Sequence, residues 1–472
     1  MKKNPKGKKS DSLKKKAIMY SFAGIADTMS YQMFTFYIFN YYYTVILGDI
    51  FLVTLGYILW SIWNAINDPL IGILSDRTST KWGRRKPYII GGIIPTCVIL
   101  VLLWMAPVDS GIIGFIYFII MINLFDTSYT SYSLSQTSLF PEMFQNLEER
   151  AKANNYVQIF NIIGLLFAAI LPSFFIKELL SPATTIPVRL NVQSQYIFAS
   201  IIMAILAAIF AAIFIIIGIQ ERKEYSKDPE KAPSFFKAMK FTFKNKAFSI
   251  YITTNLMQWY IFGLVPIINP YFLKYIINIP SAFIQQILLA IVFVSAICFM
   301  IFWRNYFAKH GARKGQMTAL AITLLTFLPF FFIWEIIGAL ITYIALGFGF
   351  AGIMFGRDVI MGAIIDKDEL ETGIRREAAY YGINALIIRF STIFVSLSLL
   401  IVFNSIGWKI YDPSTITDTI LVGIRILICI FPIVGLAVGI LFLKFFPITK
   451  EKYEEIKNQL KQIHEEKKQK VL

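Results

Sequence analysis

The sequence predicts an all-α membrane protein, because it is apolar, sparsely charged and built from long hydrophobic runs. Of its 472 residues, 57% are hydrophobic and 16% are charged, whereas about a quarter of the residues in a soluble domain are charged. The apolar runs are about 20 residues long, which is the length a helix needs to cross a hydrocarbon core of about 30 Å. Membrane strands would instead appear as short alternating segments. The spans are therefore expected to be helices.

Twelve apolar ranges follow one another along the chain. They are 17–46, 51–75, 87–107, 112–138, 155–177, 193–219, 247–275, 281–303, 315–333, 337–362, 378–404 and 419–446. The first range follows a lysine-rich start but is long, carries polar residues and has no small-residue cleavage site, so it is interpreted as a span and not as a signal peptide. Each of the other ranges is bounded by a charged or turn-forming segment, and the chain is expected to cross the bilayer twelve times.

The basic residues of the connecting segments predict the orientation. Lysine and arginine gather in 1–16, 76–86, 220–246, 304–314 and 366–377, and are absent from 47–50, 108–111 and 334–336. Because cytoplasmic loops carry the excess of these residues, both termini are expected in the cytoplasm of a cell-membrane protein. The net charge of +16 is thereby explained without a nucleic-acid partner.

The chain also repeats itself. Segment 76–86 (DRTSTKWGRRK) has an echo at 304–314 (RNYFAKHGARK), and 142–155 has an echo at 366–381. The equivalent glycines lie 228 residues apart and the equivalent arginines 226 apart. We therefore predict two six-helix halves, 17–219 and 247–446, with tails at 1–16 and 447–472; this is the architecture of major facilitator transporters. The linker 220–246 is either an amphipathic surface helix or a solvated tether.

Four segments together resemble the glycoside–pentoside–hexuronide:cation symporter family, the melibiose-permease-like branch of the major facilitator superfamily. They are NAINDPLIGILSDRTSTKWGRRKPY at 64–88, FNYYYT at the end of the first span, SLFPEMFQNLEERAKANN at 138–155 and DKDELETGIRREAAYYG at 366–382. The resemblance covers nearly the whole chain. It implies a twelve-helix fold and transport by alternating access, coupled in the sugar-transporting members to Na⁺, H⁺ or Li⁺.

Polar residues of the second and fourth spans predict a cation site. Asn64 and Asp68 are four residues apart and share a helix face, and hard cations prefer oxygen ligands. By the resemblance, Asn67, Asp68 and Thr130 keep cation-site positions, while Asn64 replaces a second aspartate. The loss of one negative charge favours proton coupling through Asp68 over Na⁺. Alternatively, Asp68 only braces its helix against the basic loop.

Intramembrane charges predict the substrate site, since a charge at bilayer depth costs at least about 2.5–3.5 kcal/mol. Asp27 lies near an acidic substrate position of the family. Ser133 and Gln158 stand where the family has a sugar-binding aspartate and an arginine, so two expected contacts are missing. Either Asp126, about two turns from Ser133, takes over, or the substrate differs from melibiose-like glycosides.

Arg389 matches a basic residue of the family. A buried cation needs a partner, and Asp68 and Asp126 are the available acids of the first half. Alternatively, Arg389 extends to the interface. Arg357 and Asp358 are adjacent, so their side chains point about 100° apart, and we expect each to contact other helices.

A cytoplasmic gate is predicted from Gly72, Asp76, Arg77, Gly83, Arg84 and Arg85. This pattern lacks the spacing of a nucleotide-binding loop, and Asp76 can form an ion pair in one conformational state only, which would bias the equilibrium toward that state.

The favoured function is cation-coupled transport of a sugar, glycoside or related small polar solute. Transport of an amphipathic or lipid-like substrate is the first alternative, and a non-transporting sensor or scaffold is the second. No nucleophile–base set, nucleotide-binding domain or metal-ligand spacing is present in the sequence. We therefore expect no enzymatic activity, no cofactor besides the coupling ion and no metal centre. The expected partners of a monomer are the solute, the cation and the bilayer.

Overall fold

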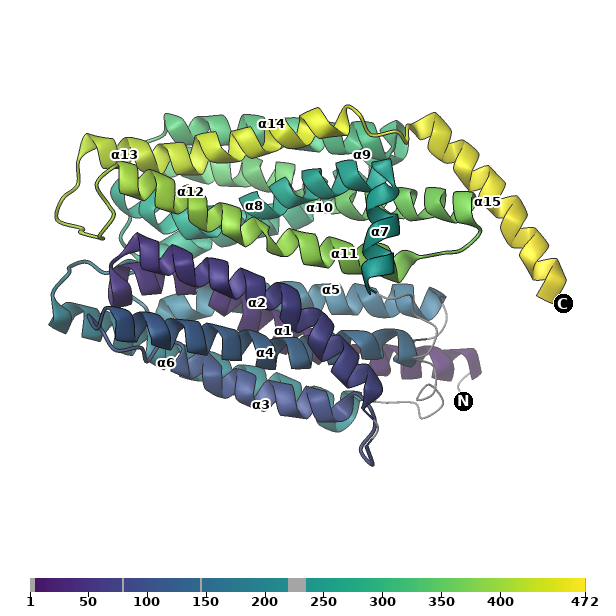
Figure 1. The fold of residues 1–472 in the computed structure, drawn as a ribbon, viewed down its shortest axis with the longest axis horizontal. Coiled ribbons are helices and arrows are strands. Elements are labelled where there is room, and N and C mark those ends of the chain that lie inside the picture. The colour runs from purple at the N-terminus through teal and green to yellow at the C-terminus, as the bar shows by residue number, and fades with distance from the viewer. Residues whose placement is uncertain (1–4, 79, 145–146, 220–234, 472) are drawn as a thin grey trace. The chain divides into compact units, whose positions relative to one another are not determined.

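The computed structural model describes residues 5–78, 80–144, 147–219 and 235–471. Within these ranges the chain is helical, and it contains two isolated bridges but no strand (Figure 1). Contacts divide it into two compact units. Unit 1 comprises Met1–Ala232, Pro280–Ile287 and Gly407–Ile416, and unit 2 comprises Pro233–Ile279, Leu288–Ile406 and Thr417–Leu472.

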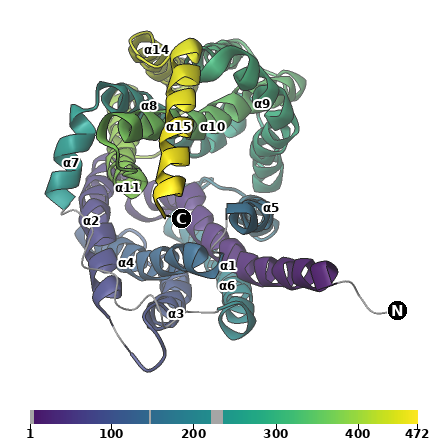
Figure 2. The same ribbon diagram turned by 90° about the vertical axis from the view of Figure 1, so that its right-hand side faces the viewer.

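Unit 1 is a bundle of six long helices, which run side by side in Figure 1; Figure 2 shows the same helices after a turn of 90°. Their bounds are α1 Pro5–Tyr41, α2 Ile50–Arg77, α3 Lys86–Leu102, α4 Ile112–Met143, α5 Leu147–Ile170 and α6 Ile186–Ile213. The π-helical turn η1 (Tyr42–Leu47) extends α1 and ends at Gly48, whose φ of 70° suits glycine. Asp49 then caps α2 by accepting a hydrogen bond of 2.8 Å from the Phe51 amide.

Two segments from the second half of the sequence pack with unit 1. The Tyr411 hydroxyl donates to the Ser181 carbonyl at 2.7 Å, and the Ile50 amide donates to the Lys409 carbonyl at 3.0 Å. The Ala282 amide donates to the Lys177 carbonyl at 2.9 Å. These bonds satisfy backbone groups that loops would otherwise leave unpaired at the ends of helices.

Unit 2 contains the remaining helices, except for the start of α9, which belongs to unit 1 up to Ile287. They are α7 Phe235–Lys244, α8 Lys246–Tyr275, α9 Ala282–Phe327, α10 Ile336–Thr372, α11 Glu377–Arg389, α12 Ser391–Ser405, α13 Asp418–Arg425, α14 Phe431–Leu443 and α15 Lys450–Val471. The short helix α7 lies crosswise to its neighbours α8 and α11 (Figure 1). It occupies part of the charged segment 220–246, for which the sequence left a helix and a tether open; residues 220–234 lie outside the described part of the chain.

Helices occupy all twelve apolar ranges. Nine helices in the described residues are long and apolar enough to span a membrane. The other predicted spans are α1 with η1, the 17-residue α3, and the second arm of α9. That arm begins at a kink at Gly311, where φ is 79°. Gly83, the equivalent glycine of the first half, also has a positive φ of 107°, so the sequence echo corresponds to a shared backbone feature.

The predicted boundaries need three corrections. Helix α6 begins at Ile186 and not at 193, because Arg189 is buried within it. Helix α10 continues to Thr372 and not to 362, because the acidic residues of its last turns are paired with arginines. Segment 304–314 is helical up to the kink and is not a loop.

Close approach of α3 and α4 depends on Gly92. A Cβ at this position would lie 2.5 Å from the Tyr132 amide nitrogen and 2.8 Å from the Ser128 carbonyl oxygen. Both atoms belong to backbone, so neither can move aside without displacing a helix. The neighbouring Gly91 faces open space, and a Cβ there would have no atom within 4 Å.

We predict that Gly92→Ala destabilises the protein by about 1–3 kcal/mol, the usual range for overpacking a well-packed core. Gly91→Ala is the matched control and should be neutral or slightly stabilising, because alanine favours helices over glycine. Thermal unfolding of the two purified variants measures the difference. Equal melting temperatures would show that the α3–α4 contact is not as close as described.

Candidate functional site

The predicted cation residues meet at the interface between α2 and α4 in unit 1. Asn64, Asn67 and Asp68 lie on α2, and Asp126 and Thr130 lie on α4. Each helix presents positions four residues apart, and such positions share a helix face. The facing side chains therefore pair in successive rungs between the two helices.

Asp126 is the centre of this polar cluster. The Asn64 side-chain amide donates to one Asp126 carboxylate oxygen at 2.7 Å, and the Asn67 amide donates to the other at 3.0 Å. One rung further along, the Thr130 hydroxyl donates to Asp68 at 3.0 Å. Asp126 is 2% exposed and Asn67 is fully buried. We call Asn64, Asn67, Asp68, Asp126 and Thr130 the α2–α4 cluster.

Several oxygen atoms of the cluster remain available for a ligand. The side-chain carbonyl oxygens of Asn64 and Asn67 are buried and have no hydrogen-bond partner, which is uncommon for buried polar atoms. Pro69 follows Asp68 within α2, and because proline has no N–H, it cannot donate to the carbonyl of Ala65. Two carboxylates, two amide oxygens, a hydroxyl and a backbone carbonyl are the ligand types that hard cations prefer.

A second group lies between α1 and α4. Ser133 and Tyr129 form side-chain hydrogen bonds with Asp27, while its other carboxylate oxygen is buried without a partner. The Tyr129 ring stacks on Tyr31 at a centroid distance of 4.7 Å. The structure thus brings Asp27 and Ser133, two of the predicted substrate residues, together, and it places Asp126 with the predicted cation residues. We call Asp27, Tyr31, Tyr129 and Ser133 the α1–α4 group.

The remaining predicted substrate residues are not part of this group. Gln158 lies on α5 with an exposed side chain. Arg389 is the last residue of α11, directly before a one-residue break in the helix at Phe390. It belongs to unit 2, and its Nε is buried.

The predicted gate residues hold the turn between α2 and α3. Arg84 forms an ion pair of 2.6 Å with Glu142 at the end of α4, and the Arg85 guanidinium donates to the Ser75 hydroxyl at 3.0 Å. Gly83 closes the turn with its positive φ. Gly72 has open space around it. The side chains of Asp76 and Arg77 lie outside the described residues.

Unit 2 has a corresponding cluster of charges where α10 ends and α11 begins. Arg376 donates two hydrogen bonds to the Asp368 carboxylate, one of them 2.8 Å long. The Tyr380 hydroxyl donates to the same carboxylate at 2.9 Å. Hydrogen bonding to Asp368 raises the pKa of Arg376 above its ordinary value. Arg375 contacts both Asp366 and Glu369 at 3.0 Å. The sequence indicated this segment as a basic cytoplasmic loop, as an echo of 142–155 and as one of the family-like segments, but not its ion pairs.

Sequence reasoning missed two buried arginines at helix ends. Arg189 on α6 donates to the Val45 and Ile46 carbonyls and pairs with Asp109 at 3.3 Å. Arg425 on α13 donates to the Phe330, Phe331 and Ile333 carbonyls. Both satisfy backbone oxygens at the end of another helix. A signal was present for Arg425, which interrupts the apolar range 419–446, but not for Arg189, which lies before the range 193–219.

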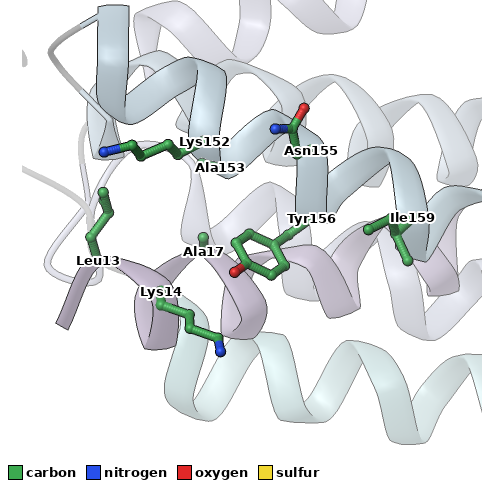
Figure 3. A pocket seen from close by; sticks show the side chains of 8 residues that line it. All are labelled: Leu13, Lys14, Ala17, Lys152, Ala153, Asn155, Tyr156 and Ile159. Carbon is green, nitrogen blue, oxygen red and sulfur yellow. The ribbon is translucent and has the colours of Figure 1, made fainter. Parts of the chain in front are cut away.

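A cavity between the beginnings of α1 and α5 is separate from these groups. It is lined by Leu13, Lys14 and Ala17 of α1 and by residues of α5 that include Lys152 and Tyr156 (Figure 3). None of the predicted site residues lines it, and it offers two cations but no acid. It is therefore unsuited to bind the coupling ion.

Comparison with known proteins finds a transporter family and several similar symporters. The family model described as MFS/sugar transport protein matches residues 19–450. A 116-residue stretch, 23% of the chain and 21% of the relative, is 40% identical to an uncharacterized symporter of Synechocystis. The sodium-dependent lysophosphatidylcholine symporter 1 of Gallus gallus is 23% identical over 86% of the chain and 81% of its own length.

Two further likenesses concern sugar transporters. The isoprimeverose transporter of Lactiplantibacillus pentosus is 27% identical over 31% of the chain and 30% of its own length. The crystal structure of a D-xylose–proton symporter superposes with a TM-score of 0.68 at 15% identity, covering 92% of this chain and 98% of that chain. This structural likeness supports the fold.

We predict that Glu142→Gln loosens the α2–α3 turn, because it removes the carboxylate that pairs with the largely buried Arg84. A lost pair of this kind is worth about 1–3 kcal/mol, which is about a 5- to 150-fold increase in local opening. Hydrogen exchange of residues 78–86 measures the change. Glu371→Gln, which removes an exposed pair with Lys367, is the control and should leave exchange in that turn unchanged. Equal exchange in wild type and Glu142→Gln would contradict the assigned role.

Proposed function

The chain belongs to the glycoside–pentoside–hexuronide:cation symporter family of the major facilitator superfamily, and we propose that it transports a sugar, glycoside or related small polar solute together with a cation by alternating access. It is a multi-pass membrane transporter and not an enzyme, as the sequence led us to expect. The α2–α4 cluster is the observation that supports cation coupling.

The composition of that cluster changes the argument about the ion. The sequence suggested that Asp68 is the one acid left at the site, since Asn64 replaces a second aspartate. In the structure Asp126 lies at the same interface, in contact with Asn64, and supplies a second negative charge from α4. Two carboxylates with several neutral oxygens suit a desolvated monovalent metal ion better than one does. We propose Na⁺ as the coupling ion, with H⁺ as the alternative.

Ion binding requires the two amides to turn. In the structure Asn64 and Asn67 offer N–H groups to Asp126 and leave their oxygens unpaired. Rotation of a side-chain amide by 180° exchanges its donor for its acceptor, so both oxygens would then face an ion held by Asp126. Without an ion, the amide N–H groups would donate to Asp126. With an ion bound, the amide oxygens would be its ligands.

The α1–α4 group supports a hydroxylated substrate. Asp27 supplies a buried carboxylate oxygen that can accept from a hydroxyl, and Ser133 can donate or accept. Tyr31 and Tyr129 provide flat apolar faces beside these polar atoms, and binding sites for small molecules combine such surfaces with a few placed polar groups. Because Ser133 shares the carboxylate of Asp27, the loss of the family's aspartate at that position is offset within the group.

An amphipathic substrate is the second candidate. The chicken relative, named a lysophosphatidylcholine symporter, matches over most of both chains, and Gln158 lacks the charge expected of a sugar contact. Uptake into proteoliposomes under an imposed Na⁺ or pH gradient separates the candidates, using a panel of labelled pentosides, hexosides, hexuronides and lysophospholipids. Accumulation of a lysophospholipid alone would establish the second candidate, and accumulation of none would overturn both.

We predict that Asp126→Asn and Asp68→Asn each reduce gradient-driven accumulation at least tenfold while sparing downhill exchange, because each removes a charge from the ion site but leaves the substrate group intact. Ser128→Ala is the matched control, since the Ser128 hydroxyl bonds to the Phe125 carbonyl of its own helix. Accumulation in vesicles under imposed Na⁺ and pH gradients is the measurement. If Asp126→Asn concentrates substrate as well as the wild type, the α2–α4 cluster is not the coupling site.

The reverse substitution tests the choice of ion. Asn64→Asp adds a third carboxylate to the cluster, directly opposite Asp126, and these two like charges repel unless a cation lies between them. We expect transport by this variant to depend more steeply on Na⁺ than transport by the wild type. An unchanged dependence on Na⁺, together with a steeper dependence on pH, would favour the proton.

We also propose that the protein is a monomer of the cell membrane with both termini and the segment 220–246 in the cytoplasm. Lys6→Cys and Lys467→Cys should therefore resist labelling by an impermeant thiol reagent in intact cells and react after permeabilisation. Asp109→Cys, in the turn before α4, should react in intact cells and is the control. Labelling of the two terminal variants from outside would contradict this orientation.

A further inference from the structure

Arg357 lies against two aromatic rings of a neighbouring helix. It is near the middle of the 37-residue helix α10. Its guanidinium carbon is 4.8 Å from the ring centroid of Trp259 and 5.3 Å from that of Phe262. Both rings belong to α8. Arg425 also lies over a ring, that of Trp334 at 4.0 Å, but its guanidinium donates to backbone carbonyls, as that of Arg189 does.

No acidic group in the described part of the chain lies within ion-pair distance of Arg357. Asp358 is its neighbour in sequence and attracts it through space, but successive side chains on a helix point about 100° apart. The aromatic partners contribute about 0.5–2 kcal/mol through cation–π attraction. They do not replace an ion pair, which the charge lacks within a span where charges are costly.

The face that carries Arg357 is accessible. Its own side chain is half-buried, Asp358 is exposed, and Trp259 is 39% exposed. Arg357 and Asp358 lie within the predicted span 337–362, and an arginine and an aspartate there cannot both face hydrocarbon without a cost. We therefore infer that this face of α8 and α10 borders an aqueous path.

A contact with aromatic rings does not use up the hydrogen-bond donors of an arginine. A guanidinium that stacks on a ring keeps its in-plane N–H groups for another partner. This planar fork matches a carboxylate or a phosphate in a bidentate arrangement. The two rings also exclude water from one side of the group, which strengthens its attraction for an anion.

We propose that Arg357, held against Trp259 and Phe262, binds the anionic group of the transported solute and makes the protein selective for organic anions over their neutral analogues. The group recognised is a carboxylate, as in a sugar acid, or a phosphate, as in a lysophospholipid head group. This inference rests on the proposed transport function and assigns its specificity to a residue of unit 2.

Ligand-induced thermal stabilisation of the purified protein tests binding without requiring transport, since a ligand raises stability with the logarithm of one plus the ratio of its concentration to its Kd. The probes are glucuronate against glucose for the carboxylate, and lysophosphatidic acid against monoacylglycerol for the phosphate. We expect the wild type to bind one of the two anions at least tenfold more tightly than its neutral analogue. The arm that responds identifies the source of the anionic group.

Three variants complete the test. Arg357→Gln should weaken binding of the preferred anion by about 10- to 100-fold, the loss expected for charge-assisted hydrogen bonds, and leave the neutral analogue unaffected. Arg357→Lys keeps the charge but not the fork, and should lie between wild type and Arg357→Gln. Arg304→Gln, which changes an exposed arginine of α9, is the control and should bind like the wild type.

The outcomes separate this proposal from the proposed function. If the wild type binds neither anion more tightly than its neutral analogue, or if Arg357→Gln and Arg357→Lys both bind the anion like the wild type, the inference is wrong. If the inference is wrong but a gradient drives accumulation of a neutral sugar, the proposed cation-coupled transport is still supported. If the anion binds through Arg357 but no gradient drives its accumulation, the site is correct and the coupling is not.

Discussion

The structure depends on the rule that a polar group within a membrane-spanning helix must find its partner inside the protein, because lipid offers none. Asp126 shows how strictly the rule applies. Both oxygens of its buried carboxylate accept hydrogen bonds from α2, and these bonds fix the register between α2 and α4. The same bonds leave two asparagine oxygens buried and unpaired. The carboxylate is thus fully hydrogen-bonded, while the two asparagine oxygens still lack a partner. Such oxygens are expected at a site that binds and releases an ion.

The rule also organises the ends of the bundles. Arg189 and Arg425 each occupy carbonyls at the end of another helix, so the backbone of one helix is completed by a side chain of another. At the α2–α3 turn and at the α10–α11 connection, arginines pair with acids from the end of a long helix. These arrangements use Glu142 in one half and Asp368 in the other, in segments whose sequences echo each other. Ion pairs of this kind can form in one conformation and break in another, which is how a gate shifts a population between states.

Much of the fold was predictable from the sequence. The length of an apolar run is set by the thickness of the bilayer, and the charge of its flanks indicates where the chain enters water. Helix ends were less predictable where a charge was buried: Arg189 looks like a loop residue until its carbonyl partners are known. The pairing of Asn64 with Asp126 could not be derived, since spacing along one helix says which residues share a face but not which face of another helix they meet. From helix spacing alone, Asp126 was assigned to the substrate site. The stacking of Arg357 on Trp259 joins residues 98 positions apart, and no local pattern announces it.

The central claim is that the α2–α4 cluster binds the coupling ion. Direct binding of radiolabelled Na⁺ to purified protein, with proton uptake followed in parallel, tests it without any assumption about the substrate. The account predicts saturable Na⁺ binding by the wild type and its loss in the double variant Asp68→Asn/Asp126→Asn, with proton uptake as the signal if H⁺ is the ion. Unchanged binding of either ion by a folded double variant would contradict it.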